Sequence, residues 1–330
     1  MSQKLKSRSN LFEKFSKQLH LLKDEGIIDI ELKYPETYIC PLCLEQFQKS
    51  DLIANKSKNY LTEEDAPPAK LKGSRIALTC FECNSKAGHQ IDHHLIHRIR
   101  EIDDSKFHKD SVQRVRVEFE DTFVNSEITS KGNGLLNVLH KMDNNNPSTL
   151  DRFIYNLKNK SVGEILNMVP NKKRIDDSKV DKALLKTNYI IAFSKFGYIF
   201  LLDSYYDTIR REIKEPDSPT EGHLMISNQF KSNHIGTYYV CNPNSKSTFN
   251  VFSLKTDYSE TLIGALLPFP NMEPKELHHN LTSIGTKFGK GKVGVTLDTR
   301  KYDPNADLFN DISEINIIIN WSKNEPQQRV

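Results

Sequence analysis

Cys40-Pro-Leu-Cys43 and Cys80-Phe-Glu-Cys83 stand thirty-six residues apart (44–79) in a chain of 330. Two thiolates that are two residues apart on a tight turn can both reach one metal ion at the Zn–S bonding distance. Two such pairs in one short segment therefore predict a Zn²⁺ site with four thiolate ligands. Redox-active pairs and unrelated buried cysteines are the alternatives, although a redox site is better served by a lone Cys-x-x-Cys.

The remaining composition is typical of an intracellular protein. The fifth cysteine, Cys241, lies in an apolar run and is interpreted as a core thiol, so no disulfide framework is expected. The start of the sequence lacks an apolar signal region, and no stretch approaches eighteen uncharged apolar residues. We expect a cytoplasmic protein with no membrane partner. The formal net charge of +3 is too small to indicate nucleic acid by itself.

Hydrophobic spacing predicts an α+β fold in four parts. Leu11, Phe15, Leu19 and Leu22 recur at helical spacing, which predicts a helix from about 11 to 24 that stops at Gly26. We assign an N-terminal helix to residues 1–34, a zinc module to 35–103, an α+β connector to 104–180 and a C-terminal α+β domain to 181–330. The connector carries an expected strand near 115–119. The C-terminal domain is interpreted as a sensing, oligomerisation or partner-docking region.

The C-terminal region shows two kinds of pattern. Helical stripes run over 185–196, ending at Gly197, and over 198–209, and we interpret their aromatic residues as packing faces rather than base-stacking surfaces. Short β-branched and aromatic runs predict strands further on. These expected strands cover 236–240, 248–254, 262–267, 293–297 and 315–321.

The segment between and around the cysteine pairs reads LTEEDAPPAKLKG over 61–73 and IALTCFECNSKAG over 76–88. It resembles the HNH endonuclease superfamily, also called the ββα-metal nucleases. In that family an acidic residue and a His end the first strand of a hairpin, and Pro, a Gly-containing turn and a second strand follow. A knuckle then ends in a Cys that precedes Asn or His at the start of a helix. The resemblance covers about residues 38–100.

The resemblance implies a treble-clef fold with structural zinc and a second, catalytic divalent ion, Mg²⁺ or Mn²⁺. Four thiolates close the zinc sphere and leave no position for substrate, so catalysis would require another ion with oxygen ligands. Glu64 and Asn84 match family positions that hold this ion. Asp65 stands where the family carries its general-base His, and an ordinary carboxylate with a pKa of about 3.9 accepts a proton from water poorly. Either Asp65 joins Glu64 and Asn84 as a metal ligand, or the module binds without hydrolysis.

His89 is the candidate for a substitute base, because the resemblance extends to the Gly88-His89 segment. At about 100° per residue, one regular helix would place His89, His93 and His97 on the face opposite Asn84. An interruption at Gly88 would let His89 turn toward the hairpin. His93, His94 and His97 are interpreted as a solvated or phosphate-facing surface. A Zn²⁺ site at His89 and His93 is a weaker alternative, since no zinc-protease Glu flanks them.

Local positive charge favours contact with DNA. Lys70, Lys72 and Arg75 surround the expected hairpin turn, and Lys86 lies on the expected helix, where phosphates would pass. The alternative is that these cations only solvate a small zinc module. Such contacts carry no information on base sequence.

These observations lead to three hypotheses. The first is a metal-dependent endonuclease that hydrolyses DNA phosphodiester bonds; the family context suggests an anti-phage defence effector. The second is a catalytically inactive zinc module that serves as a DNA-binding or protein-docking platform. The third is a zinc-dependent regulator whose activity resides in the C-terminal region, although no nucleophile motif or glycine-rich phosphate loop supports it.

Overall fold

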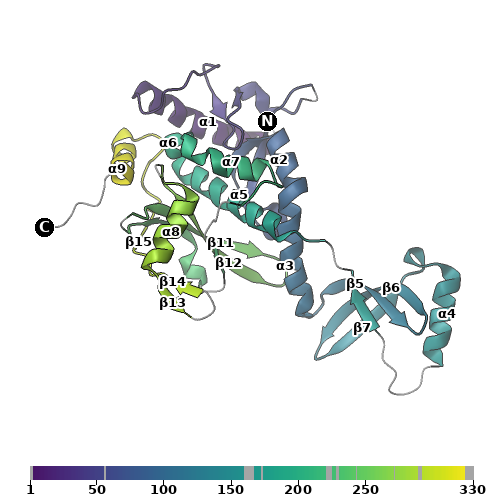
Figure 1. Cartoon of the computed structure of the whole chain (residues 1–330). Helices are drawn as coiled ribbons and strands as arrows, with labels where there is room; N and C mark the ends of the chain where they lie inside the picture. The colour runs from purple at the N-terminus through teal and green to yellow at the C-terminus, as the bar shows by residue number, and fades with distance from the viewer. Residues whose placement is uncertain are drawn as a thin grey trace. The chain divides into compact units, whose positions relative to one another are not determined.

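The computed structural model describes residues 3–55, 57–159, 167–171, 174–220, 225–227, 230–242, 244–270, 272–288 and 292–323. Helices and antiparallel sheets make up the structure, so the expected α+β class is confirmed. The chain folds into two compact units (Figure 1). The first unit comprises the described parts of 1–96, 176–256 and 260–330, and the second those of 97–175 and 257–259. The cysteine module and the C-terminal region thus belong to one unit.

The amino-terminal part of the first unit contains one long helix and a cysteine-bearing hairpin. Helix α1 (Gln3–Asp24) includes the helix expected at 11–24 and stops before Gly26, which has a φ of 68°. Strands β1 (Tyr38–Ile39) and β2 (Gln46–Phe47) form one antiparallel pair. Strands β3 (Leu61–Ala66) and β4 (Ser74–Cys80) form the next hairpin. Helix α2 (Phe81–Ala87), a π-helical turn (Gly88–Asp92) and helix α3 (His93–Ser105) follow.

The rest of the first unit combines helices with a five-stranded antiparallel sheet. Its sheet has the order β15-β10-β11-β12-β9. The strands are β9 (Met225–Ser227), β10 (Gly236–Val240), β11 (Ser247–Lys255), β12 (Glu260–Pro268) and β15 (Thr299–Lys301). The helices are α5 (Asp177–Phe196), α6 (Tyr198–Leu201), α7 (Asp207–Lys214), α8 (Pro274–Ile284) and α9 (Ile312–Lys323), and β13 (Thr286–Phe288) pairs with β14 (Lys292–Gly294). In the described part of the chain, no helix is both long and apolar enough to cross a lipid bilayer.

Helix α5 joins the hairpin and the large sheet into one core. It contacts β3 and β4 as well as β11 and β12. Most of its residues are buried, and Figure 1 shows its place among the elements of the first unit. The ring of Phe193 stacks on Phe15 of α1 with 4.5 Å between the ring centroids. The helix ends at Gly197, whose φ of 57° is favourable only for glycine. The stripe at 185–196 is therefore a packing face, as expected.

Two expectations for the C-terminal region are corrected. Residues 315–321, expected as a strand, belong to helix α9, because Asp311 accepts a hydrogen bond from Ser313 N (2.8 Å) at its start. Ile315 and Ile318, three residues apart, are the buried positions of this helix, so the apolar run has a helical period. The stripe at 198–209 is not one helix: α6 ends at Leu201, and Asp203 starts a separate turn before α7. Of 293–297, only the first two residues belong to a strand.

The second unit is a four-stranded antiparallel sheet covered on one face by a helix. The sheet order is β7-β6-β5-β8, with β5 (Val112–Phe119), β6 (Thr122–Gly132), β7 (Leu135–His140) and β8 (Asn167–Pro170). Helix α4 (Pro147–Lys158) begins after Asn146, whose side chain accepts from the amides of Ser148 and Thr149. Leu150 and Phe153 of α4 pack on the apolar face of the sheet. The strand expected at 115–119 is confirmed, within a compact unit rather than an irregular connector.

Candidate metal centre

Two tight turns bring the four cysteines of the module together. At the first pair, Leu44 N donates to Cys40 O and Cys40 N donates to Glu45 O, both at 2.9 Å. Leu44 closes this turn with a φ of 62°. At the second pair, Cys80 ends β4 and caps α2, where its sulfur accepts from Cys83 N at 3.4 Å. The two turns thus bring the four sulfur atoms close to one another.

The four sulfur atoms form a compact cluster that could hold a metal ion. All of them lie within 4.8 Å of one another, and the sulfur atoms of Cys43 and Cys80 are 3.7 Å apart. A tetrahedron with Zn–S bonds of about 2.3 Å has edges of about 3.8 Å, so the spacing fits that ion. Hydrogen bonds from the other thiols, Cys40 first, lower the pKa of Cys80, and burial raises the pKa of Cys40. Among the described residues, no other group of three or more His, Cys, Asp and Glu side chains is placed to share an ion.

Buried tyrosines fix the first cysteine pair to the core of the unit. The hydroxyl of Tyr198 donates to Ile39 O and accepts from Ile39 N, both at 2.8 Å. The hydroxyl of Tyr189 donates to Pro41 O at 2.9 Å. Both tyrosines come from the segment 189–198, about 150 residues later in the sequence. The C-terminal region therefore holds the first cysteine turn in place.

Glu64 lies in the interior of the unit and has partners on both carboxylate oxygens. Glu64 is 2% exposed. Thr79 Oγ1 of β4 donates to Oε2 at 2.7 Å. Lys186 Nζ of α5 lies 2.8 Å from Oε1. The carboxylate that the resemblance assigns to a divalent ion is thus bound to an internal ammonium group.

Lys186 forms the centre of a buried group of three charges. The residue is fully buried, and its ammonium also lies 2.7 Å from Asp92 Oδ2. Burial disfavours the charged ammonium, but the charges of Glu64 and Asp92 outweigh this effect and raise the pKa of Lys186. Burial raises the pKa of Asp92, and the charge of Lys186 opposes that shift. The ammonium therefore stays charged and acts as the counter-cation of both carboxylates.

Asp65 differs from Glu64 in its surroundings. The strand register shifts between the two residues, and Asp65 pairs with Arg75 of β4. Arg75 Nε lies 3.9 Å from Asp65 Oδ1, and Arg75 Nη1 lies 3.3 Å from Glu63 Oε2. Burial raises the pKa of Asp65, while the charge of Arg75 lowers it. Asp65 thus takes part in a half-exposed ion pair of the hairpin.

Asn84 supports the hairpin through its amide nitrogen. Its Nδ2 donates to Glu63 O at 2.9 Å and to Thr62 Oγ1 at 3.0 Å. These bonds hold the start of α2 against β3. They also fix the side chain on the backbone of residues 62–63, whereas the carboxylate of Glu64 points toward Lys186. In this arrangement the amide nitrogen of Asn84 contacts the hairpin backbone, Glu64 contacts Lys186, and Asp65 lies beside Arg75.

The helix after the hairpin is interrupted near Gly88, as the sequence allowed, but a different residue turns inward. His89 is exposed, whereas Asp92 is 7% exposed. A π-helical turn takes one extra residue per turn and so rotates the positions that follow. Asp92 and Lys186 are the two residues of this group that sequence reasoning missed. The acidic residue four places after Gly88 was the available signal for Asp92, and none marked Lys186.

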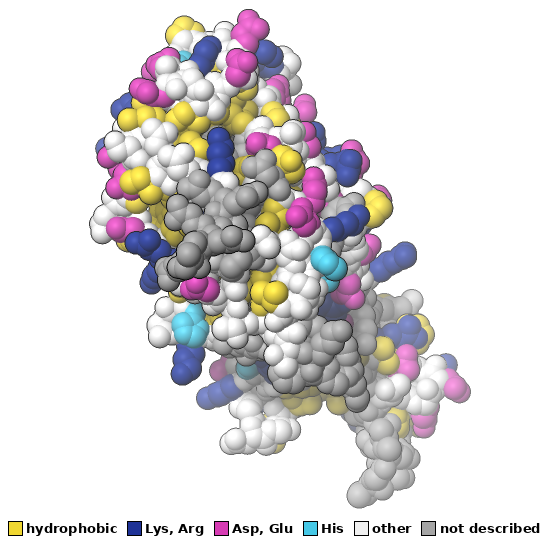
Figure 2. All heavy atoms as spheres, turned by 60° about the vertical axis from the view of Figure 1, so that its left-hand side comes forward, with side chains coloured by type: hydrophobic (Ala, Val, Ile, Leu, Met, Phe, Trp, Pro, Cys, Tyr) yellow, Lys and Arg dark blue, Asp and Glu magenta, His cyan; other side chains and the backbone are white. Residues whose placement is uncertain are grey.

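The four cations proposed to bind phosphate lie at the surface of the module. Lys70, Lys72, Arg75 and Lys86 are all exposed. Arg75 is engaged by acidic neighbours, as described above. On the face in Figure 2, lysine and arginine side chains are interspersed with acidic ones rather than gathered in one large patch.

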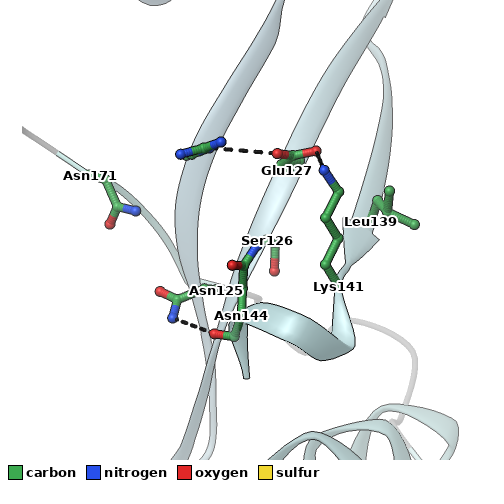
Figure 3. Close-up of a pocket in the computed structure, with 8 residues that line it drawn as sticks. Asn125, Ser126, Glu127, Leu139, Lys141, Asn144 and Asn171 are labelled. Atoms are coloured by element: carbon green, nitrogen blue, oxygen red, sulfur yellow. Dashed lines mark hydrogen bonds and ion pairs between the residues drawn. The ribbon is translucent and has the colours of Figure 1, made fainter. Parts of the chain in front are cut away.

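The second unit has a polar hollow of about 260 Å³ on its sheet (Figure 3). Glu127 of β6 pairs with Lys141 at 2.5 Å and with Arg114 at 3.6 Å. Asn125 Nδ2 donates to Asn144 O at 3.1 Å at the other end of the hollow. Arg114 and Lys141 together carry one more charge than Glu127, so the hollow offers amide groups and one surplus positive charge.

Comparison of the chain with models of protein families, with curated proteins and with solved structures finds no match.

Proposed function

We propose that the first unit is a zinc-organised nucleic-acid-binding platform that does not hydrolyse its ligand. In this proposal Cys40, Cys43, Cys80 and Cys83 hold one structural Zn²⁺. The closed set of four thiolates leaves zinc no position for substrate, and its role is to fix the two turns and the start of α2. The surface near the hairpin turn would then contact phosphates.

The observation that carries the proposal is the Lys186 ammonium beside Glu64. Hydrolysis of a phosphodiester by this kind of module needs a divalent ion that contacts both the protein and a phosphate oxygen. Lys186 and Thr79 already engage both oxygens of Glu64. The residue is also 2% exposed, so a phosphate has no approach to it in this conformation. Binding without chemistry is the function that this arrangement favours.

Lys70 and Lys72 lie next to the hairpin turn, and Lys86 lies on α2, so these residues would supply the phosphate contacts. Contacts of this type give affinity that falls with salt and does not depend on sequence. A binding protein of this kind would retard many DNA molecules equally. The proposal therefore concerns affinity for the polyanion and not recognition of a site.

The test uses full-length, zinc-loaded protein with supercoiled plasmid and Mg²⁺ or Mn²⁺. We expect retardation of the plasmid without nicking. The double variant Lys70→Glu/Lys72→Glu should weaken binding, and the slope of log K against log salt should become shallower by about 0.9 for each phosphate that the protein no longer neutralises. Lys17→Glu/Lys23→Glu, the same charge change at exposed positions of α1, is the matched control and should weaken binding much less.

The second candidate is the endonuclease, and the order of elements favours it. The hairpin β3/β4 runs directly into α2, and Asn84 at the start of α2 donates to the hairpin backbone. Nicking that is abolished by Glu64→Gln would establish this candidate and refute the platform. In that case Asp65→His should raise the rate, because it would restore the general base.

A further inference from the structure

We propose that Glu64 and Asp92 form a seat for a divalent cation, and that the Lys186 ammonium fills this seat as a tethered substitute for the ion. The seat is defined as the space between Glu64 Oε1 and Asp92 Oδ2. This inference rests on the proposed non-hydrolytic function, since it explains what replaces the second ion. It also assigns a ligand role to Asp92, which lies outside the expected set of Glu64, Asp65 and Asn84.

Geometry gives the first argument. One nitrogen atom lies 2.8 Å from Glu64 Oε1 and 2.7 Å from Asp92 Oδ2. Carboxylate oxygens from two separate elements, β3 and the π-helical turn, thus converge on one cationic centre. Mg²⁺ and Mn²⁺ prefer carboxylate oxygens as ligands, with bonds of about 2.0–2.1 Å for Mg²⁺. A small ion at this centre requires the two carboxylates to move together by only about 1 Å.

Charge gives the second argument. One ammonium faces two carboxylates, so the buried group keeps one surplus negative charge if all three are ionised. A divalent ion would balance both carboxylates completely. Uncompensated charge in the interior is costly, and burial accordingly raises the pKa of Asp92. The seat is thus better matched in charge to a divalent ion than to the lysine that occupies it.

An unused acceptor gives the third argument. Asp92 Oδ1 is buried and has no hydrogen-bond partner among the described residues. Buried polar atoms are nearly always paired, so such an atom needs an explanation. A carboxylate that turns both oxygens toward a metal ion would use it. The π-helical turn at 88–92 is the feature that directs this side chain inward.

Lys186 has a structural effect that a free ion would not have. An ion would bind only β3 and the π-helical turn, whereas Lys186 adds α5 to the same centre. The module is thereby joined to the helix that also contacts β11 and β12. Removal of the lysine should leave two adjacent buried carboxylates that repel each other. A divalent ion supplied from solution should then relieve that repulsion.

The experiment compares wild type with Lys186→Met, a variant of similar length without charge, in zinc-loaded full-length protein. Mn²⁺ binding is followed by the decrease in the electron spin resonance signal of free Mn²⁺, and folding by circular dichroism. We expect Lys186→Met to take one Mn²⁺ per chain and to melt at a higher temperature when Mn²⁺ is present. Wild type should take none at this position and should show no such shift.

Two further variants make the outcome decisive. Lys186→Met/Asp92→Asn should bind Mn²⁺ at least about tenfold more weakly, because one of the two carboxylates is gone. Glu64→Gln/Asp92→Asn/Lys186→Met, loaded with zinc like the other variants, should fold without added Mn²⁺. If Lys186→Met is unfolded alone, Mn²⁺ should restore its fold. The proposal is overturned if Lys186→Met takes no Mn²⁺ while the triple variant folds, or if wild type binds Mn²⁺ through Glu64. Plasmid nicking is a separate readout and tests the proposed function alone.

Discussion

Cys83 supplies one of four sulfur atoms in a cluster whose members lie within 4.8 Å of one another. Structural zinc binds small peptides with an apparent free energy of about 10–16 kcal/mol, and most of this energy is coupled to folding. Cys83→Ser should therefore lose its zinc to a mild chelator and unfold at a clearly lower temperature. Elemental analysis and thermal melting measure both effects. Cys241→Ser, outside the cluster, should keep one zinc per chain; equal metal content in the two variants would contradict the assignment.

Gly197 ends α5 with a φ of 57° and lies against Gln18 of α1. Gln18 Nε2 donates to Phe196 O at 3.1 Å, and its Oε1 accepts from Tyr198 N at 2.8 Å. A Cβ at position 197 would collide with this amide. Gly197→Ala should cost at least about 1–3 kcal/mol from backbone strain alone, and more from the collision. Denaturant unfolding measures the cost.

Gly26 provides the matched control for that variant. It also has a positive φ, of 68°, but a Cβ there meets no atom within 4 Å. Gly26→Ala should cost only about 1–2 kcal/mol, the ordinary penalty of the left-handed conformation. An equal decrease in stability in the two variants would mean that the close approach of Gln18 contributes nothing.

The single residues that could be predicted were those whose role follows from their neighbours in the sequence. The thiolates follow from spacing alone, and the stop at Gly26 follows from its position after a helical stripe. Lys186 was not predictable, because its partners Glu64 and Asp92 are about 120 and 94 residues away in the sequence. A lysine in an apolar helix carries no sign of which buried carboxylate it meets.

Helix α5 begins at a hydrogen bond that depends on pH. Asp176, its N-cap residue, donates its backbone N–H to His94 Nδ1 at 3.1 Å. Only a neutral imidazole can accept there. Desolvation lowers the pKa of His94 below the ordinary value of 6.5, and the charges of His93 and Lys179 add to this shift.

The sign of the pH effect follows from that direction. A histidine with a lowered pKa stabilises the folded state in its neutral form, and this contribution is lost as pH falls below 6.5 through the shifted pKa. We expect the protection factors of the amides of residues 178 and 179, which compare their exchange with that of an unfolded chain at the same pH, to decrease over that range. In His94→Asn the amide oxygen can accept the same bond without titrating, so protection should then be independent of pH. Unchanged protection in the wild type would contradict this account.

Elements whose hydrophobic residues follow a single helical or strand period were predictable. Elements whose form depends on a cap or on an interruption of the helix were not. The helix at 11–24 and the strand at 115–119 followed from clear patterns. The apolar run at 315–321 supports both a strand and a helix by composition, and the cap at Asp311 decides for the helix. The π-helical turn at 88–92 rotates the side-chain directions of the residues that follow, so a regular helical wheel could not predict that Asp92 points inward.

At the scale of the whole molecule, the cysteine module is not a separate domain. Tyr189 and Tyr198 bind its backbone, and Lys186 binds its carboxylates, all from the segment 186–198. The predicted boundaries place the module and this segment in different domains, because pairings between distant segments leave no periodic signal in the sequence. The cysteine cluster and α5 therefore belong to one compact unit.

The most direct test of the account is a crystal structure of the wild-type protein grown with Mn²⁺, with anomalous diffraction recorded at the zinc and manganese edges. The account predicts a zinc peak at the four thiolates. Between Glu64 and Asp92 it predicts the Lys186 ammonium and no manganese peak. A manganese peak in contact with the Glu64 carboxylate would contradict it.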